Sequence, residues 1–533
     1  MTGIGKRTVP KSLAGFLFVG FYAIAANIPF WVASCWLSIL HDGWFSISYA
    51  AVGLLALIAP RAVTALVLLL AMIADVGYGV SESYGIPALD LWKNLGTLQE
   101  FSGSRILVIG TVTILALLVV GLSACLPARR IRRDYGLRVA AGLAGFACLC
   151  LSADFVTTAS RNHRLTNPFV VAPIDSINPG YSTELRLSRI HVLRLVQSLA
   201  LYSSRRDYQA KSAPVPSAVA LAVGYAKLNS ARSEEELPNL VVILVESWGL
   251  STDPTINRGL AEAYAQQGLL ARYEVHQGTV PFHGSTINAE ARELCGSGMG
   301  FHILIAPRQE LGPCLPDRLA GLGYRIVALH GMRGHVFNRS VWWERIGFQQ
   351  RWFRDRLQRE GLPDCVGAYV GTCDAAIAQW MGRRLEPREA SPTFLYWVTL
   401  HSHLPVPVPS PFSGTFPCPA GQSMSAQSPL CSWYGLVANV NDSVARLAMG
   451  NLGRPTIFVI VGDHAPPFSD PVLRDQFSWS DVPYVLLVPR AEQQRSTNGI
   501  ALNSPASTDA ASSASSSQIA VRNAIQPSRV NSP

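Results

Sequence analysis

Long apolar segments separated by short polar breaks fill the first third of the chain. The segments at 13–40, 106–126 and 137–156 are each long enough to cross a bilayer as a helix. The block at 45–80 is too long for one helix and is interrupted by Pro60 and Arg61. This block therefore forms either one broken helix or a tight hairpin of two spans, the first of them short.

Positively charged residues favour the hairpin. Lys6, Arg7 and Lys11 precede the first apolar segment, and an arginine-rich stretch occupies 129–133. Because loops rich in Lys and Arg remain in the cytoplasm, both stretches belong on that side, and only two spans within 45–80 allow this. The pattern predicts about five spans, with the chain outside the cytoplasm after residue 156. The first apolar segment lacks an obvious cleavage site, so we expect it to remain as an anchor.

A different pattern begins near residue 238, where short apolar runs alternate with helical patterns. This alternation predicts an α/β domain with a largely parallel central sheet and helices on both faces. The runs lie at 240–245, 325–329, 393–400, 456–461 and 482–488.

The remaining stretches differ in composition from both parts. Polar and arginine-rich residues from 158 onward predict a helical connector near the membrane surface, and the Ser- and Ala-rich end of the chain is typical of a disordered tail. We therefore divide the chain into a transmembrane domain (1–157), a connector (158–237), a globular domain (238–490) and a tail (491–533).

Composition agrees with a membrane protein that carries a globular domain. The chain has 533 residues, of which 49% are hydrophobic and 15% charged, so it is too long for one domain and too apolar to be wholly soluble. The formal net charge of +9 raises the question of nucleic-acid binding. The arginines at 129–133, however, lie between two apolar segments, as in a cytoplasmic loop, so we expect a membrane and no nucleic acid as partner.

Six of the ten cysteines fall inside the globular domain, in pairs that are close in sequence. An even number in an oxidising compartment favours disulfides, although six cysteines allow fifteen connectivities. A cysteine zinc site would need a close CxxC pair, which this region lacks. We favour bonds between sequence neighbours: Cys295 with Cys314, Cys365 with Cys373, and Cys418 with Cys431.

Two apolar runs end abruptly in residues that bind metals. The run at 240–245 stops at Glu246, and the run at 456–461 is followed by Gly462, Asp463 and His464. Since ligands bind at the carboxyl ends of strands in an open α/β sheet, these side chains are expected at one rim. Two carboxylates and an imidazole suit zinc or manganese. The alternative is that each is a solvated residue at a strand end.

A candidate nucleophile lies in the segment 283–296. Gly284 marks a turn and the following residues favour a helix, which places Ser285 and Thr286 at a helix N-terminus. A hydroxyl there can attack phosphorus while helix amides stabilise the transferred anion. The alternative is an ordinary N-cap, a position that Ser and Thr prefer without any catalytic role.

Five motifs in a fixed order resemble those of the membrane-anchored phospholipid head-group transferases. This family includes lipoteichoic-acid synthases, periplasmic-glucan phosphoglycerol transferases and phosphoethanolamine transferases of the alkaline phosphatase/sulfatase superfamily. The resemblance covers 239–488, and about five spans before an extracytoplasmic domain also match. The motifs are NLVVILVESWG, GSTINAE, LHGMRGHVFNRSVWWERIGF, TLHSHLP and VGDH.

The resemblance implies metal ligands at Glu246, Asp463 and His464, with Thr286 as nucleophile and further ligand. Thr286 is preferred to Ser285 because the family's threonine follows a glycine by two positions and precedes an acidic residue by four. The nine-residue step from Thr286 to a Cys-Gly pair also resembles the glucan phosphoglycerol transferases.

Further residues match positions at which the family holds its substrate. Arg339 suits a phosphate oxygen, and His330 and Asn338 also match substrate-contact positions. His403 is expected to hold phosphate or to protonate the leaving alkoxide. His401 lies on the same strand face and is either a structural neighbour or a ligand of a second metal.

The implied activity is a metal-dependent transfer of a phospholipid head group, with phosphoglycerol favoured, through a phospho-threonine to a hydroxyl of a glycan or polysaccharide. The expected location is the cytoplasmic (inner) membrane, with a sulfatase-like catalytic domain in the periplasm or outside the cell. Alternatives are a phosphoethanolamine transferase, a phosphodiesterase or sulfatase-type hydrolase, and an inactive member that binds a glycan or a partner.

A short motif favours the sulfatase alternative. Cys314, Pro316 and Arg318 fit the CxPxR signature by which sulfatases generate formylglycine. Here, however, the motif runs directly into the helix that precedes the strand at 325–329. We therefore expect Cys314 to open that helix and to form a disulfide.

Overall fold

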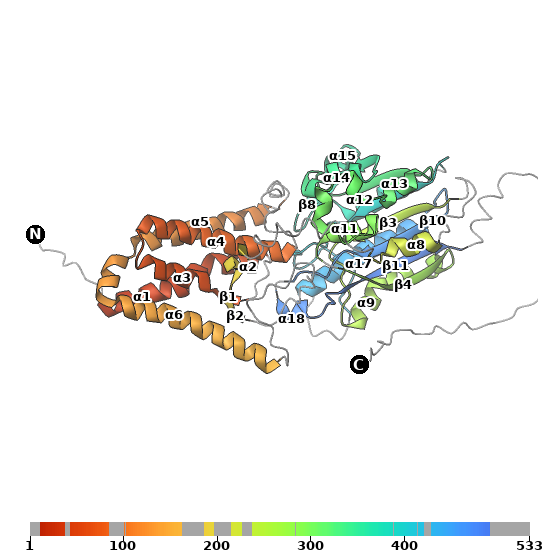
Figure 1. Ribbon diagram of the computed structural model, residues 1–533. Coiled ribbons are helices and arrows are strands. Elements are labelled where there is room, and N and C mark those ends of the chain that lie inside the picture. The colour runs from red at the N-terminus through yellow and green to blue at the C-terminus, as the bar shows by residue number, and fades with distance from the viewer. Residues whose placement is uncertain are drawn as a thin grey trace, which may run out of the picture.

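The computed structural model describes residues 11–37, 43–84, 101, 103–161, 186–193, 195–196, 215–225, 237–282, 284–386, 389–412, 414–419, 428–468 and 470–490. A helical bundle lies at one end of the molecule and an α/β domain at the other (Figure 1). Most of the expected connector and the whole expected tail lie outside the described residues.

Apolar helices build the bundle. Four of them are long and apolar enough to cross a membrane, namely Leu13–Trp36, Arg61–Ser81, Gly103–Cys125 and Ile131–Phe155, and Ile47–Ala56 is a shorter apolar helix. Two helices flank the break at Pro60, as in the expected hairpin, and only the second of them is long enough to cross a membrane by itself. The full elements are α1 (Lys11–Ala23), η1 (Ala25–Asn27), α2 (Ile28–Leu37), α3 (Ile47–Ala56), α4 (Arg61–Tyr84), α5 (Gly103–Cys125) and α6 (Ala128–Arg161).

A short pair of parallel strands joins the helical bundle to a segment further along the chain. Strand β1 (Gly43–Ser46) pairs with β2 (Arg186–Arg189), which falls within the stretch expected to be a helical connector. Arg189 at the end of β2 forms a fully buried ion pair with Asp75 of α4, with 2.7 Å between Nη2 and Oδ2. This pair fixes the strand against the inside of the bundle.

The α/β domain is built on a seven-stranded sheet with the order β4-β11-β10-β3-β9-β5-β6. Strands β10, β3, β9, β5 and β6 are parallel to one another, whereas β11 is antiparallel to both of its neighbours, β10 and the edge strand β4. Every residue of β3, β9 and β10 is buried, which explains their unbroken apolar sequences. The strands are β3 (Asn239–Val245), β4 (Tyr273–Pro281), β5 (Arg325–His330), β6 (Gln350–Trp352), β9 (Thr393–Val398), β10 (Thr456–Gly462) and β11 (Asp481–Pro489).

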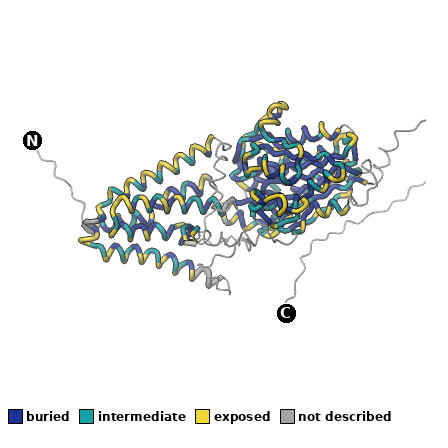
Figure 2. Tube along the Cα trace, turned by 45° about the horizontal axis from the view of Figure 1, so that its top comes forward, coloured by how far each residue is buried: buried dark blue, intermediate teal, exposed yellow. Residues whose placement is uncertain are grey.

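Helices cover this sheet in two groups. The long helix α17 (Pro429–Met449) packs with α16 (Asp374–Leu385) and α9 (Pro254–Ala261), while α8 (Ala218–Tyr225) packs with α11 (Thr286–Cys295) and against β10. Buried residues concentrate in this domain, and exposed residues follow the outer sides of the bundle (Figure 2). The smaller elements are η6 (Glu262–Ala265), α10 (Gln267–Leu270), η7 (Gly300–Leu304), α12 (Arg308–Leu311), α13 (Leu315–Ala320), η8 (Val336–Asn338), α14 (Arg339–Arg345), α15 (Arg354–Arg359), β7 (Asp364–Val366), β8 (Val370–Thr372) and α18 (Pro471–Arg474).

The three expected disulfides form, each between sequence neighbours. They join Cys295 to Cys314, Cys365 to Cys373, and Cys418 to Cys431. The other four cysteines, Cys35, Cys125, Cys148 and Cys150, are free and lie in the apolar helices. The preference for local pairing is therefore confirmed.

Candidate metal centre and nucleophile

Two neighbouring strands bring the acidic residues to one rim of the sheet. Strands β3 and β10 are parallel, and Val245 lies opposite Gly462 in their register. The next residue on each strand is therefore Glu246 on one side and Asp463 on the other. The Asp463 amide donates to the Val245 carbonyl at 3.2 Å, which continues the ladder for one more step.

Glu246, Asp463 and His464 form a compact buried cluster. One ligand atom from each lies within 4.8 Å of the others, and no other such group occurs in the described ranges. His464 Nε2 is 3.3 Å from Asp463 Oδ2 and 3.5 Å from Glu246 Oε1. The cluster is a candidate site for a divalent metal.

The hydrogen bonds around the cluster fit a bound cation. Asp463 Oδ1 accepts from the amides of Ser247 and His464, whereas its Oδ2 is buried and accepts no hydrogen bond from the described residues. His464 Nδ1 lies 2.9 Å from the Ala465 carbonyl, so the proton on Nδ1 donates there and Nε2 presents its lone pair to the cluster. A second partner that fixes the imidazole in this way is typical of metal-binding histidines.

The electrostatics of the cluster also favour a cation. Burial raises the pKa of Glu246 and of Asp463, and the Asp463 charge raises the pKa of Glu246 further. Burial alone would lower the pKa of His464, but the charges of Asp463 and Glu246 outweigh it and raise that pKa. A divalent ion would offset the cost of holding two buried carboxylates together.

The backbone beside Glu246 is unusual and closely packed. Ser247 adopts φ 55, in the left-handed region, and its hydroxyl donates to Glu246 Oε1 at 2.9 Å. Trp433 Nε1 donates to the Ser247 carbonyl at 2.9 Å. Gly462 allows this approach, because a Cβ there would lie 1.9 Å from the carbonyl oxygen of Trp248. The turn after β3 therefore holds the Glu246 carboxylate in place.

Thr286 is the first residue of α11, and its hydroxyl faces the cluster. Thr286 Oγ1 donates to Glu246 Oε2 at 3.3 Å and lies 3.5 Å from His464 Nε2. The cap position belongs to Ser285, whose amide donates to Asn288 Oδ1 at 3.2 Å. An N-cap role therefore accounts for Ser285 and not for Thr286.

His403 lies close to this site. Its Nδ1 is 2.6 Å from the Leu404 carbonyl, and its ring stands edge-on to Tyr369 with 4.8 Å between centroids. The pKa of His403 is lowered to about 4, chiefly by burial; the charge of Glu246 opposes this shift, and the charge of Arg105 adds to it. His403 is therefore a neutral imidazole at neutral pH.

The structure gives other partners to two of the three remaining candidate substrate-binding residues. Arg339 is buried in an ion pair with Glu290, which lies one turn beyond Thr286 on α11, at 2.7 Å between Nη2 and Oε1. His330 Nδ1 is 3.0 Å from the Val398 carbonyl, and burial together with the Arg339 charge keeps its pKa well below the usual range. Asn338 is exposed, with φ 53. Their role in substrate binding stays a prediction.

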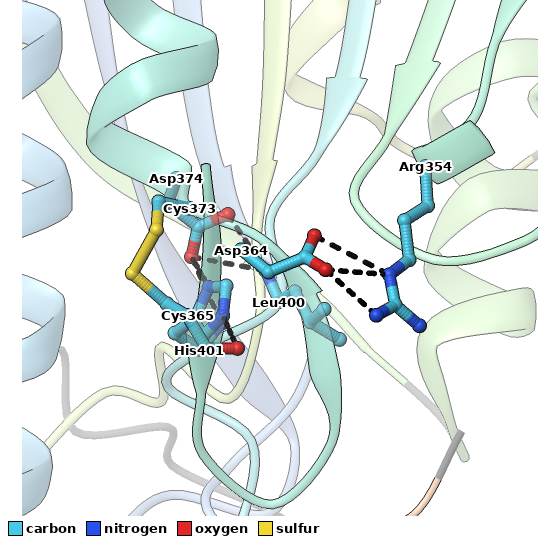
Figure 3. The surroundings of a disulfide bond; sticks show 7 residues. All are labelled: Arg354, Asp364, Cys365, Cys373, Asp374, Leu400 and His401. Carbon is cyan, nitrogen blue, oxygen red and sulfur yellow. Dashed lines mark hydrogen bonds and ion pairs between the residues drawn. A yellow bond between two sulfur atoms is a disulfide. The ribbon is translucent and has the colours of Figure 1, made fainter. Parts of the chain in front are cut away.

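His401 has partners on both ring nitrogens. Its Nδ1 lies 3.1 Å from Asp374 Oδ2, and its Nε2 lies 3.3 Å from the Cys365 carbonyl (Figure 3). Burial lowers the pKa of His401, but the Asp374 charge outweighs this effect and raises it. These contacts favour a structural role beside the Cys365–Cys373 disulfide over a second metal site.

Cys314 precedes α13 and is bonded to Cys295. It opens the helix that leads to β5, as the sequence predicts, and its sulfur is not available for conversion to formylglycine.

Sequence reasoning missed the contact between the bundle and the rim. Arg105, near the start of α5, donates from Nη2 to the Leu404 carbonyl at 2.9 Å. The sequence signal was a single cation two residues inside an otherwise apolar span.

A model of the sulfatase family matches residues 238–515, just over half of the chain. A comparison with curated proteins finds no match.

Several solved structures are similar to the α/β domain. A protein of the alkaline phosphatase superfamily from Vibrio parahaemolyticus is 15% identical over 48% of this chain and 60% of its own, with a TM-score of 0.33, so the match spans less than two thirds of that relative. The phosphoglycerol transferase GacH of Streptococcus pyogenes, in complex with sn-glycerol-1-phosphate, is 15% identical over 50% of this chain and 74% of its own, with a TM-score of 0.35. The C-terminal periplasmic domain of EcEptC from Escherichia coli, in its zinc complex, is 12% identical over 49% of this chain and 75% of its own, with a TM-score of 0.32.

The family match confirms the expected superfamily and its mostly parallel sheet, here preceded by four to five apolar helices. The chain belongs to the sulfatase family.

Proposed function

We propose that this protein is an extracytoplasmic metal-dependent transferase that moves a phospholipid head group, phosphoglycerol in the first place, to a hydroxyl of a glycan or polysaccharide. The observation that carries the proposal is the Thr286 hydroxyl, 3.3 Å from Glu246 and 3.5 Å from His464 at a buried cluster of metal-ligand type. A hydroxyl in that position at a helix N-terminus is placed to attack an anionic phosphorus centre.

Glu246, Asp463 and His464 would hold zinc or manganese, with Thr286 as a further ligand. When bound, the ion supplies Lewis-acid chemistry at the phosphoryl group and at the attacking hydroxyl. The orphaned Asp463 Oδ2 and the lone pair of His464 Nε2 are the atoms that support this assignment.

The chain's own residues account for the group transfer. Thr286 Oγ1 attacks phosphorus, so that an O–P bond forms while the P–O bond to diacylglycerol breaks. Thr286 Oγ1 donates to Glu246 Oε2 at 3.3 Å, so this carboxylate can take the threonine proton, and neutral His403, on which the Glu246 charge acts, can relay it. The same proton then passes to the diacylglycerol alkoxide. In the second half, an acceptor hydroxyl attacks phosphorus, the Thr286 O–P bond breaks, and threonine recovers its proton.

The remaining features fit a lipid donor outside the cytoplasm. The bundle keeps the site next to a membrane, and the three disulfides suit an oxidising compartment. The disulfide at Cys314 argues against formylglycine chemistry and hence against sulfate-ester hydrolysis. Phosphoglycerol is favoured over phosphoethanolamine because the motif spacing resembles the glucan phosphoglycerol transferases.

The test is an assay of both products. Purified full-length protein with added zinc or manganese is incubated with vesicles of phosphatidylglycerol or phosphatidylethanolamine, with and without a glucan oligosaccharide. We expect diacylglycerol release from phosphatidylglycerol and a phosphoglycerol-modified oligosaccharide, and neither product from Thr286→Ala. Release of free glycerol phosphate with unmodified oligosaccharide would instead identify a hydrolase. Diacylglycerol release from neither lipid, by protein loaded with metal, would overturn the proposal.

A further inference from the structure

Arg105 is a buried cation at the junction of the bundle and the catalytic rim. Only 5% of its surface is exposed, although it belongs to α5, whose exposed side chains are mostly apolar. Its guanidinium lies 5.2 Å from the ring centroids of both Phe101 and Tyr369, and these two rings stack on each other. The aromatic pair thus holds the guanidinium in a fixed position.

The same side chain is tied to the loop that carries His403. Arg105 Nη2 donates to the carbonyl of Leu404, the residue after His403, and the Tyr369 ring contacts that of His403. The charges of Arg105 and Glu246 both act on His403, which places Arg105 in the electrostatic surroundings of the metal-ligand cluster.

Within the described residues, Arg105 has no carboxylate partner, and its buried Nε makes no hydrogen bond. Three other buried arginines do have a carboxylate partner: Arg189 pairs with Asp75, Arg292 with Glu293 and Arg339 with Glu290. A buried guanidinium without an anion is costly. Among the described residues no carboxylate neutralises this guanidinium, so the position can take an anion.

The location of Arg105 indicates where that anion comes from. Arg105 is the third residue of a candidate span, at the end that meets the catalytic domain, which is the level of lipid head groups. The next two residues, Ile106 and Leu107, are 53% and 72% exposed. A phospholipid can therefore lay its acyl chains along α5 and bring its phosphodiester to the guanidinium.

We propose that Arg105 binds the phosphodiester of the donor phospholipid and holds it at the rim beside His403, so that the bundle supplies part of the substrate site. This inference rests on the proposed transferase function. An arginine suits the task because its planar fork can bond a phosphate oxygen while Nη2 keeps its contact with Leu404.

The test measures lipid binding without turnover. Full-length Thr286→Ala protein, loaded with zinc, is titrated in nonionic detergent with phosphatidylglycerol or with diacylglycerol, and bound lipid is counted by native mass spectrometry. Arg105→Gln in this background should weaken phosphatidylglycerol binding roughly 10- to 100-fold and leave diacylglycerol binding unchanged. Arg105→Lys should bind phosphatidylglycerol with an affinity between that of the parent protein and that of Arg105→Gln, since lysine keeps the charge but lacks the planar guanidinium. Arg61→Gln, which removes an exposed arginine from the start of α4, is the matched control and should change neither affinity.

Each outcome separates this inference from the proposed function. Equal losses for both lipids would show that Arg105 only docks α5 on the rim, and unchanged phosphatidylglycerol binding in Arg105→Gln would equally overturn the inference. Arg105-dependent binding of soluble sn-glycerol-1-phosphate without phospholipid binding would make the ligand a soluble anion and also overturn it. If wild type releases no diacylglycerol while phosphatidylglycerol binding still depends on Arg105, the transferase proposal is wrong and the anion site stands.

Discussion

Thr286 and Glu246 meet at 3.3 Å although 40 residues separate them in the chain. Glu246 follows β3, and Thr286 begins α11, so the contact joins the end of a buried strand to the first turn of a helix. His464 lies 3.5 Å from the same hydroxyl. This arrangement gives the hydroxyl a carboxylate and an imidazole as neighbours and makes its role testable.

Replacement of Asp463 tests the metal site. Asp463→Asn should lower affinity for zinc or manganese by about tenfold or more, because it removes a charged ligand. In the absence of metal the variant should be at least as stable as wild type, since burial raises the Asp463 pKa and its ionised form is therefore destabilising at neutral pH. Metal content and thermal unfolding with and without chelator measure both effects.

Asp355→Asn is the matched control, because Asp355 is an exposed partner of Arg333 on the same domain. It should leave metal content unchanged. Asp463→Asn protein that retains full metal content would contradict the assignment of Asp463 as a ligand.

The sequence predicted much of this site because its residues lie beside long apolar strands. Unbroken runs at β3 and β10 identify buried strands, and their shared direction places Glu246 beside Asp463. Strand β4 was not predicted, because it is a sheet edge whose side chains alternate irregularly between buried and exposed. The Arg105–Leu404 contact spans 299 residues, and no local pattern encodes a contact of that length.

The His401–Asp374 pair should make stability depend on pH. Asp374 raises the pKa of His401 in the folded protein. The stabilisation that this pair gives the folded state is therefore fully present below the unfolded histidine pKa of about 6.5, and it is lost as the pH rises through the folded pKa. The advantage of wild type over Asp374→Asn should therefore be larger at about pH 5.5 than at about pH 9. Denaturant unfolding of metal-free protein at several pH values measures it, and an advantage that grows with pH would refute the pairing.

The Cys365–Cys373 disulfide should stabilise the loop that holds His401. The two cysteines are 8 residues apart, for which chain entropy predicts roughly 2.5 kcal/mol. Replacing both with serine should lower the free energy of unfolding by about this amount, whereas Cys35→Ala, a free cysteine in α2, should change little. Alkylation under non-reducing conditions provides the complementary measurement. Labelling of all six cysteines of the α/β domain in native protein would contradict the structure.

The charge pattern predicts which side of the membrane each loop occupies. Reporter fusions placed after Leu126 and after Thr157 bracket the candidate span Ile131–Phe155 of α6. They should report opposite sides, with the fusion after Leu126 in the cytoplasm. Matching signals from the two fusions would exclude the topology on which an extracytoplasmic active site depends.

Substitutions at the start of α11 separate catalysis from helix capping. Thr286→Ala should lower the rate of diacylglycerol release by many powers of ten. It should cost little stability, because Ser285 holds the cap position. Thr286→Ser should retain some turnover. Ser285→Ala should cost about 1 kcal/mol of stability and remain active. Inactivity of a well-folded Cys314→Ala variant would point back to sulfatase chemistry.

The most direct test of the transferase account is the mass of Thr286 itself. Purified protein loaded with zinc or manganese is incubated with mixed phospholipids and no glycan acceptor, quenched and digested, and the peptide that contains Thr286 is analysed by mass spectrometry. The account predicts that this peptide gains one phosphoglycerol group on Thr286 and that added glucan oligosaccharide removes it. A Thr286 peptide that stays unmodified while diacylglycerol accumulates would contradict the account.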